Sequence, residues 1–194
     1  FQGNPTGNKS ASLANFPAPP EPTSGSRTLA ERLKFPEYVP PALILPHGKV
    51  GNSPSGVACD MSKGKFGPWE SHMLIGEQTA SQVQRVNLEV VNGLYQGAVF
   101  HFLGGFEAGL IPVRMDQEDG TLFVGGSNRG WGSRGSKNFT FERVRFKGKV
   151  PFEMHAISAR NDGFEVTFTH PVDAAAAADV ANYSMDTFTY IYQS

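Results

Sequence analysis

The chain has 194 residues, which is enough for one large or two small domains with a hydrophobic core. Its 17 Lys and Arg residues nearly balance 18 Asp and Glu residues, so it lacks the basic excess that nucleic-acid-binding domains usually carry. No apolar run reaches the roughly 20 residues that a membrane-spanning helix needs, and the single cysteine, Cys59, excludes an internal disulfide.

The composition favours β-structure, because 22 Gly and 14 Pro residues disfavour helices and 15 Phe residues suit strands. Residues 1–46 form a separate, extended lead segment in our interpretation. Residues 16–22 (FPAPPEP) are proline-rich and should be extended. Within the lead segment, Thr28–Lys34 is predicted to form a short helix, with Thr28 as its cap and Glu31 at the capping-box position.

Residues 47–150 show the pattern of strands and tight turns. Four strands are predicted, at residues 55–60, 72–77, 82–91 and 94–103. The dipeptide Asn92-Gly93 between the last two is a strong signal for a tight hairpin turn. Four consecutive antiparallel strands joined by turns form a meander, which is one blade of a β-propeller.

A second copy of this pattern follows the first. Residues 111–115, 121–125 and 141–147 match the first three strands, and the segment FERVRFK aligns with VQRVNLE of the first copy. The separation of about 50 residues is typical of propeller repeats. Two blades cannot close a propeller, so we expect further blades from the same parent chain or from a partner chain.

Residues 151–194 are predicted to begin an immunoglobulin-like β domain. Strands are expected at residues 152–158, 164–169 and 183–192. The alanine run at 174–178 is expected to be a crossover loop, because Asp173 and Asp179 flank it, with a half-turn of helix as the alternative. An immunoglobulin-like sandwich needs about seven strands, so this domain should be partial. The predicted fold class is therefore all-β, with about two propeller blades followed by the start of an immunoglobulin-like domain.

Five segments carry a resemblance to a known family: residues 45–56 (LPHGKVGNSPSG), 64–69 (GKFGPW), 76–100, 128–135 (NRGWGSRG) and 151–173. They resemble the C-terminal part of secreted bacterial β-propeller proteins of the sorbosone or sugar dehydrogenase-like type, which are related to pyrroloquinoline-quinone (PQQ) enzymes. The resemblance implies a secreted or periplasmic oxidoreductase that oxidises a sugar-like alcohol or aldehyde. It also implies PQQ and calcium as cofactors and a c-type cytochrome module as a possible neighbour.

The strand order predicts that four loops meet at one end of the blades, at residues 47–54, 78–82, 104–110 and 127–138. Their polar residues form the candidate site: His47 as a catalytic base, Glu77 as a metal ligand, and Asn52, Gln78, Arg129, Trp131 and Arg134 as cofactor contacts. Arginines could bind the carboxylates of PQQ in a bidentate manner, and Trp131 could stack on a planar ring or a sugar face.

Each of these residues also has a structural interpretation. His47 can be a hydrogen-bonded structural histidine, and the arginines can pair with acidic residues of neighbouring strands. Calcium takes 6–8 oxygen ligands, so one carboxylate does not establish a site. His72, His101, His155 and His170 lack the spacing of a zinc site. Cys59 is expected to be a small core residue.

The sequence leaves two classes of function open. The first is a fragment of a quinone-dependent sugar dehydrogenase, which would be inactive without its other blades. The alternative is a non-catalytic module, or a structural scaffold, whose propeller and immunoglobulin-like domains bind a small sugar, a polysaccharide or a protein.

Overall fold

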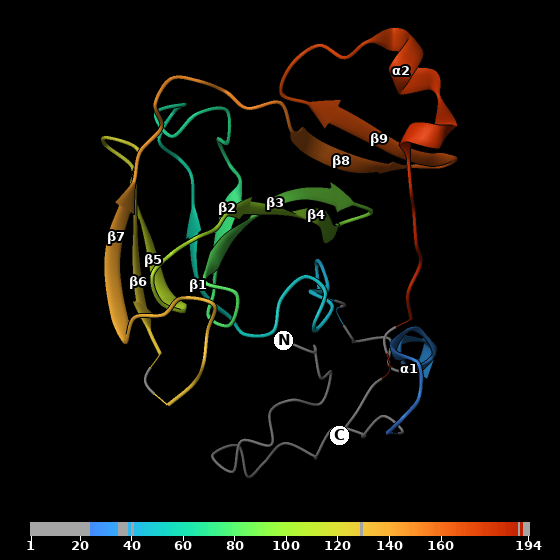
Figure 1. The fold of residues 1–194 in the computed structure, drawn as a ribbon. Coiled ribbons are helices and arrows are strands. Elements are labelled where there is room, and N and C mark those ends of the chain that lie inside the picture. The colour runs from blue at the N-terminus through green and yellow to red at the C-terminus, as the bar shows by residue number, and fades with distance from the viewer. Residues whose placement is uncertain (1–23, 35–38, 40, 129, 190, 192–194) are drawn as a thin grey trace. The chain divides into compact units, whose positions relative to one another are not determined.

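The computed structural model describes residues 24–34, 39, 41–128, 130–189 and 191 (Figure 1). Within this part, the chain consists mainly of antiparallel strands with little helix, which confirms the predicted all-β class. Contacts divide the chain into two compact units, Leu45–Val172 and a unit formed by the residues before and after that range. Strands β1 to β9 all lie within Leu45–Val172.

The first sheet is a four-stranded antiparallel meander. Its strands follow one another in chain order: β1 (Pro54–Cys59), β2 (Met73–Glu77), β3 (Gln82–Val91) and β4 (Leu94–Leu103). Asn92 and Gly93 join β3 to β4 with φ angles of 52° and 77°. Asn and Gly adopt this left-handed conformation more readily than other residues, so the hairpin turn predicted from the sequence is confirmed.

The second sheet has three strands in the order β5 (Leu110–Asp116), β6 (Thr121–Ser127) and β7 (Phe139–Val144). The prediction for the third strand was residues 141–147, but β7 ends at Val144. Arg145 follows the strand, and its guanidinium donates to the Thr121 hydroxyl at 2.9 Å and to the Asp119 carboxylate at 3.2 Å.

The two sheets have the same register between their second and third strands. Ile75 of β2 pairs with Gln84 of β3, and Val124 of β6 pairs with Glu142 of β7. Each of these third-strand residues is followed by an Arg-Val dipeptide. The register therefore confirms the alignment of VQRV with FERV that the sequence predicted.

The first strands of the two sheets also share an irregularity. Pairing with the second strand shifts between Pro54 and Val57 in β1, and between Leu110 and Val113 in β5. A bulge inserts an unpaired residue and increases the local twist. The two sheets thus correspond in sequence and also in this irregular strand pairing.

A matching aspartate turn follows each first strand. The Asp60 carboxylate accepts a hydrogen bond from the Ser62 amide at 2.9 Å, and the Asp116 carboxylate accepts one from the Glu118 amide at 2.8 Å. After this common start the connections differ, because the first runs through residues 60–72 and the second only through 117–120.

The two sheets pack against each other through β1 and β5. The Ser55 hydroxyl lies 2.9 Å from the Leu110 carbonyl and 3.0 Å from the Gly76 carbonyl. A Cβ atom on Gly56 would lie 2.8 Å from the Val113 amide nitrogen, so only glycine fits there. The core between the sheets consists of Phe66, Trp69, Leu74, Val83, Phe106, Leu110, Val113, Leu122 and Val124.

Cys59 is a free cysteine on the exposed side of β1. Successive side chains of a strand point to opposite faces, and the neighbouring Ala58 packs against the core. The prediction that Cys59 is a core residue is therefore wrong, because short apolar runs do not reveal which face of the strand is covered.

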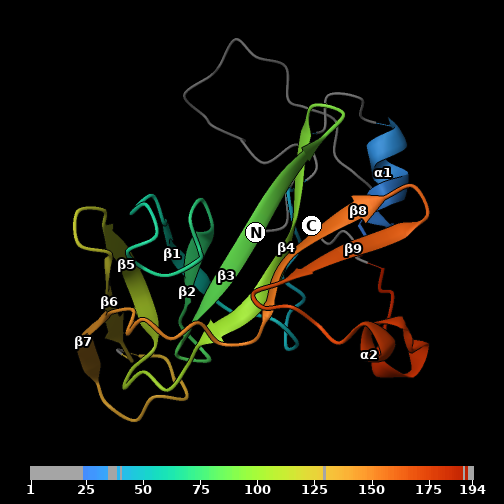
Figure 2. The same ribbon diagram turned by 90° about the horizontal axis from the view of Figure 1, so that it is seen from above.

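A hairpin formed by β8 (Met154–Arg160) and β9 (Gly163–Phe168) completes this unit. Strand β8 contacts β3 and β4 of the first sheet, as Figure 2 shows. Both strands lie within two residues of the predicted ranges. The unit therefore continues past residue 150, where the sequence pattern changes.

The other unit contains α1 (Thr28–Lys34), α2 (Ala174–Ala178) and the 3₁₀ turn η1 (Val180–Asn182). The helix at α1 was predicted. The crossover loop predicted for the alanine run is wrong: Asp173 caps a helix there by accepting a hydrogen bond from the Ala176 amide at 2.8 Å.

The strand predicted for residues 183–192 is also wrong. Residues 183–189 contain no strand, and Ile191 forms only an isolated bridge with Arg27. The proline-rich stretch at 16–22 lies outside the described residues. In the part of the chain that is described, no helix is both long and apolar enough to cross a membrane.

Candidate functional site

The structure brings together the four loops that the strand order predicted to meet. The Gln78 amide donates to the Ser53 carbonyl at 3.0 Å, and the Arg134 amide donates to the Thr79 carbonyl at 2.9 Å. The Lys137 amide donates to the Glu107 carbonyl at 2.9 Å. These bonds join the loops at 47–54, 78–82, 104–110 and 127–138 into one surface.

Glu77, the predicted metal ligand, is fully buried and binds backbone instead. One carboxylate oxygen accepts hydrogen bonds from the amides of Asn52 and Ser53, at 2.9 and 2.6 Å, and the other accepts from the Ala80 amide. Both oxygens are thereby occupied. The described residues contain no group of three His, Cys, Asp or Glu side chains that could hold a metal ion. This arrangement does not fit calcium.

His47 and Asn52 lie on one exposed turn before β1. The Asn52 side-chain oxygen accepts a hydrogen bond from the Gly48 amide at 2.7 Å, which closes the turn that carries His47. Gly48 has a φ of 76°, so the turn also depends on a glycine. The observed contact gives Asn52 a structural role, and a catalytic role for His47 stays a prediction.

Two predicted residues, Gln78 and Trp131, line a cavity of about 500 Å³. The Trp131 side chain is 73% exposed at this cavity, whereas Gln78 is only 7% exposed. The Gln78 Nε2 atom is buried and has no hydrogen-bond partner among the described residues. Most buried polar atoms are paired, so an unpaired donor needs an explanation. The remaining lining residues are Ser53, Pro54, Ser55, Thr79, Ile111 and Gly132.

The loop that carries Trp131 is organised by Asn128, which the sequence analysis missed. The Asn128 Nδ2 atom donates to the carbonyls of Gly135 and Lys137, both at 2.8 Å. Its Oδ1 atom accepts from the Gly109 amide at 2.9 Å and from the Ser133 hydroxyl at 2.6 Å. One half-buried amide group thus fixes a glycine-rich loop, and nothing in the loop composition distinguishes this asparagine.

Arg134 lies at a different cavity, of about 400 Å³, which is formed by residues 80–82, 104–107 and 134–137. Arg129 lies outside the described residues. The predicted cofactor set is therefore split: Gln78 and Trp131 share one cavity, and Arg134 borders another. Among the described residues, no arginine lines the cavity that contains Trp131.

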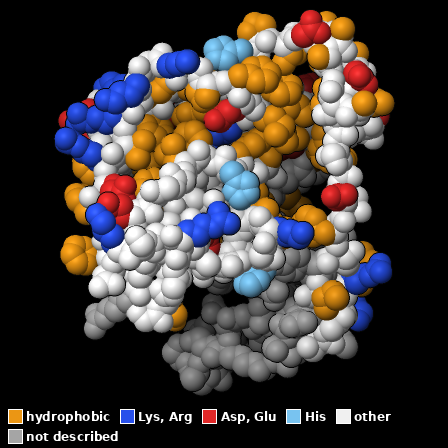
Figure 3. Space-filling model, in the orientation of Figure 1, with side chains coloured by type: hydrophobic (Ala, Val, Ile, Leu, Met, Phe, Trp, Pro, Cys, Tyr) orange, Lys and Arg blue, Asp and Glu red, His pale blue; other side chains and the backbone are white. Residues whose placement is uncertain are grey.

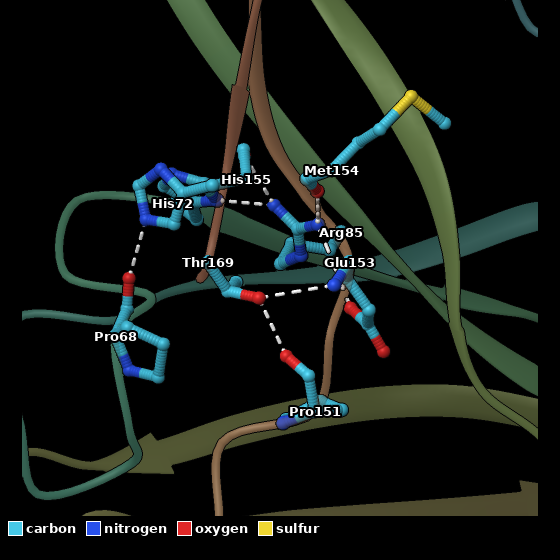
Figure 4. A network of polar contacts seen from close by, with 8 residues as sticks. All are labelled: Pro68, His72, Arg85, Pro151, Glu153, Met154, His155 and Thr169. Atoms are coloured by element: carbon cyan, nitrogen blue, oxygen red, sulfur yellow. Dashed lines mark hydrogen bonds and ion pairs between the residues drawn. The ribbon is translucent and has the colours of Figure 1, made fainter. Parts of the chain in front are cut away.

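A buried polar network centres on Arg85, which the sequence pattern does not single out (Figure 4). The fully buried guanidinium donates to the Met154 carbonyl at 2.7 Å and to the His155 carbonyl at 2.8 Å. It also lies 2.9 Å from the His72 Nδ1 atom. Arg85 therefore ties strand β8 to the first sheet.

Aromatic rings enclose the same guanidinium. Its central carbon lies 4.0 Å from the centre of the Trp69 ring and 4.3 Å from that of Phe100. Burial lowers the pKa of Arg85 to about 10, while the Glu153 carboxylate acts in the opposite direction. The guanidinium thus stays protonated at neutral pH, and its positive charge is stabilised by cation–π contacts.

His72 must be neutral to accept a hydrogen bond from Arg85 at Nδ1. Burial, Arg85 and His155 together lower the pKa of His72 to about 4. Between pH 6.5 and pH 4 the unfolded chain takes up a proton at this position and the folded chain does not. The free energy of unfolding should therefore fall as the pH drops through this window, by up to about 3 kcal/mol.

Urea unfolding at pH 7, 6, 5 and 4 tests this prediction. The variant His72→Gln keeps an acceptor for Arg85 but cannot titrate, so its free energy of unfolding should fall less between pH 6.5 and pH 4. The control His101→Gln changes an exposed ring on β4 and should keep the wild-type slope. Equal slopes for wild type and His72→Gln would contradict the assignment.

No protein-family model matches the chain, and no curated protein matches it either. The resemblance to sugar dehydrogenase-like propellers therefore remains an expectation from the sequence segments that carry it.

Proposed function

We propose that the chain is a non-catalytic carbohydrate-binding module, built from two β-propeller blades and the first strands of an immunoglobulin-like domain. The observation that carries the binding role is the cavity of about 500 Å³ in which exposed Trp131 lies with the polar side chains of Ser53, Gln78 and Thr79. Sugar rings present an apolar face and several hydroxyl groups. An indole supplies the stacking surface, and the hydroxyl groups of Ser53 and Thr79 at this cavity supply hydrogen bonds.

The identification of the sheets as propeller blades is supported by their shared register, bulge and aspartate turn. The burial of side chains in the two sheets also supports this identification. Val113 and Leu122 of the second sheet are buried against the first, whereas the equivalent Val57 is exposed. Exposed Cys59 lies on the same face as Val57. Ile75, Gln84 and Val86 on the same face are already buried, so in this proposal only the β1 part of the face packs on a preceding blade.

The dehydrogenase activity implied by the family resemblance receives no support from this geometry. The Glu77 carboxylate is bonded to three backbone amides, and Arg134 lies apart from Trp131. A dye-reduction assay with a panel of sugars, PQQ and calcium decides between the two functions. Turnover that depends on PQQ would overturn the non-catalytic proposal.

Replacing Trp131 by alanine should weaken carbohydrate binding about tenfold or more, because the stacking surface is lost. The protein should remain folded, since the indole is largely exposed. The measurement is retention of the wild type and the variant on a glycan array, followed by titration with the best-retained glycan. Tyr95→Ala removes another exposed aromatic ring, on β4, and should leave retention unchanged. Equal retention of wild type and Trp131→Ala would remove this cavity from the proposal.

A further inference from the structure

Strand β7 has one open edge. It pairs with β6 on one side, and no strand of the described residues pairs with its other side (Figure 2). In the first sheet, the equivalent strand β3 pairs on that side with β4. An open edge presents unpaired amide and carbonyl groups, which are a template for another strand.

Two large apolar side chains of β7 are exposed. Phe139 and Phe141 are each 78% exposed, and the Phe141 ring stacks on Phe123 with 5.9 Å between ring centres. A hollow of about 740 Å³ borders the edge and is lined by Glu107 and residues 136–141. Large exposed apolar side chains beside an open strand are typical of interaction sites.

The surroundings of Arg143 also indicate an open position at this edge. The register makes it the equivalent of Arg85, whose guanidinium is covered by Phe100, the residue directly opposite on β4. On its outer side, Arg143 has no strand of the described residues beside it, and its side chain is exposed. Among the described residues, its side chain has no hydrogen bond or ion pair. The position that an aromatic ring fills in the first sheet is therefore open in the second.

Basic side chains near the C-terminal end of β7 favour one orientation of an added strand. Lys147 and Lys149 follow the end of β7 and are exposed, and Figure 3 shows Lys and Arg side chains gathered at the upper left of the molecule. An antiparallel strand beside β7 would start at this end. Acidic residues near the start of such a strand would complement these lysines.

We propose that the outer edge of β7 binds an extended peptide segment of a partner protein as an added antiparallel strand. The segment carries an aromatic residue that covers Arg143, as Phe100 covers Arg85, and acidic residues before it. Main-chain hydrogen bonds supply the pairing, and the cation–π contact fixes the register. This site is separate from the Trp131 cavity and does not depend on carbohydrate binding.

The chain itself provides a probe, because β4 is the strand that the equivalent edge already binds. The probe is a fluorescent peptide with the sequence of residues 94–103 (LYQGAVFHFL), preceded by two aspartates. Fluorescence anisotropy with the full chain should show saturable binding. The same peptide with Phe100→Ala should bind at least fivefold more weakly, and so should the wild-type peptide to the chain variant Arg143→Ala.

Two chain variants serve as controls. Arg114→Ala removes an exposed arginine from β5, at the opposite edge of the same sheet, and should bind the peptide as the wild type does. Trp131→Ala should also bind it normally, which separates this site from the proposed carbohydrate site. Circular dichroism checks that each variant is folded.

Three outcomes would overturn the proposed strand binding, and a fourth would overturn the aromatic contact. One is the absence of saturable binding, and another is equal binding of a scrambled peptide. The third is a dimer of the chain in sedimentation that excludes the peptide, because a second copy would then cover the edge. Unchanged affinity of Arg143→Ala would likewise remove the aromatic contact and the register that it defines.

Discussion

Replacing Arg85 by methionine is expected to lower the free energy of unfolding by about 3–5 kcal/mol. Methionine fills part of the space but donates no hydrogen bonds. The carbonyls of Met154 and His155 and the Nδ1 atom of His72 would then be left without their donor. The β8–β9 hairpin should also detach more readily, because Arg85 joins it to the first sheet.

The second sheet offers a matched control for this experiment. Arg143 occupies the equivalent register position but is exposed, so Arg143→Met should change the free energy of unfolding by less than about 0.5 kcal/mol. Urea unfolding gives the global effect, and amide hydrogen exchange in β8 and β9 gives the local one. Similar losses for both variants would show that burial of Arg85 does not matter.

Replacing Glu77 by glutamine should cost about 2–4 kcal/mol. The substitution replaces one carboxylate oxygen by an NH₂ group, which cannot accept a hydrogen bond from the backbone. At least one of the amides of Asn52, Ser53 and Ala80 would lose its partner. Hydrogen exchange at these three amides should therefore accelerate, together with a lower urea midpoint.

Glu70 provides the comparison, because its exposed carboxylate also accepts hydrogen bonds from two backbone amides, those of Lys63 and Gly64. Glu70→Gln should cost less than about 1 kcal/mol, since water can replace its lost bonds. Melting with calcium and with a chelator tests the other role of Glu77. A calcium-dependent rise in melting temperature that Glu77→Gln abolishes would contradict the structural assignment.

Much of the strand framework could be predicted because its signals are local. Alternating side chains, Asn92-Gly93 and the repeated Arg-Val dipeptide give the order and the register of both sheets. The C-terminal segment was predicted less well. Alanine is the strongest helix former, and Asp173 caps the alanine run, so the local preference for helix prevailed over the crossover loop that was expected.

The candidate site was predicted only in outline. The strand order was sufficient to bring four loops together, but not to assign their side chains to cavities. The Arg85 network was missed because its partners are distant in sequence: Arg85 and His155 are separated by 70 positions. A sequence pattern shows that an arginine lies among valines on a strand. It does not show that Trp69 and the β8 backbone surround it.

The connections that follow the two aspartate turns differ in length. The sheet with the longer connection has a buried arginine, Arg85, and the sheet with the shorter one has an exposed arginine, Arg143, at the equivalent position. The longer one, residues 60–72, supplies Phe66, Trp69 and His72, all buried beside the first sheet. The shorter one, residues 117–120, supplies only a turn. Inserting residues at this point can thus enlarge the interior of one repeat while its strand pairing stays intact. A change in one loop can thus give two sheets with the same strand pairing different stabilities and different accessible surfaces.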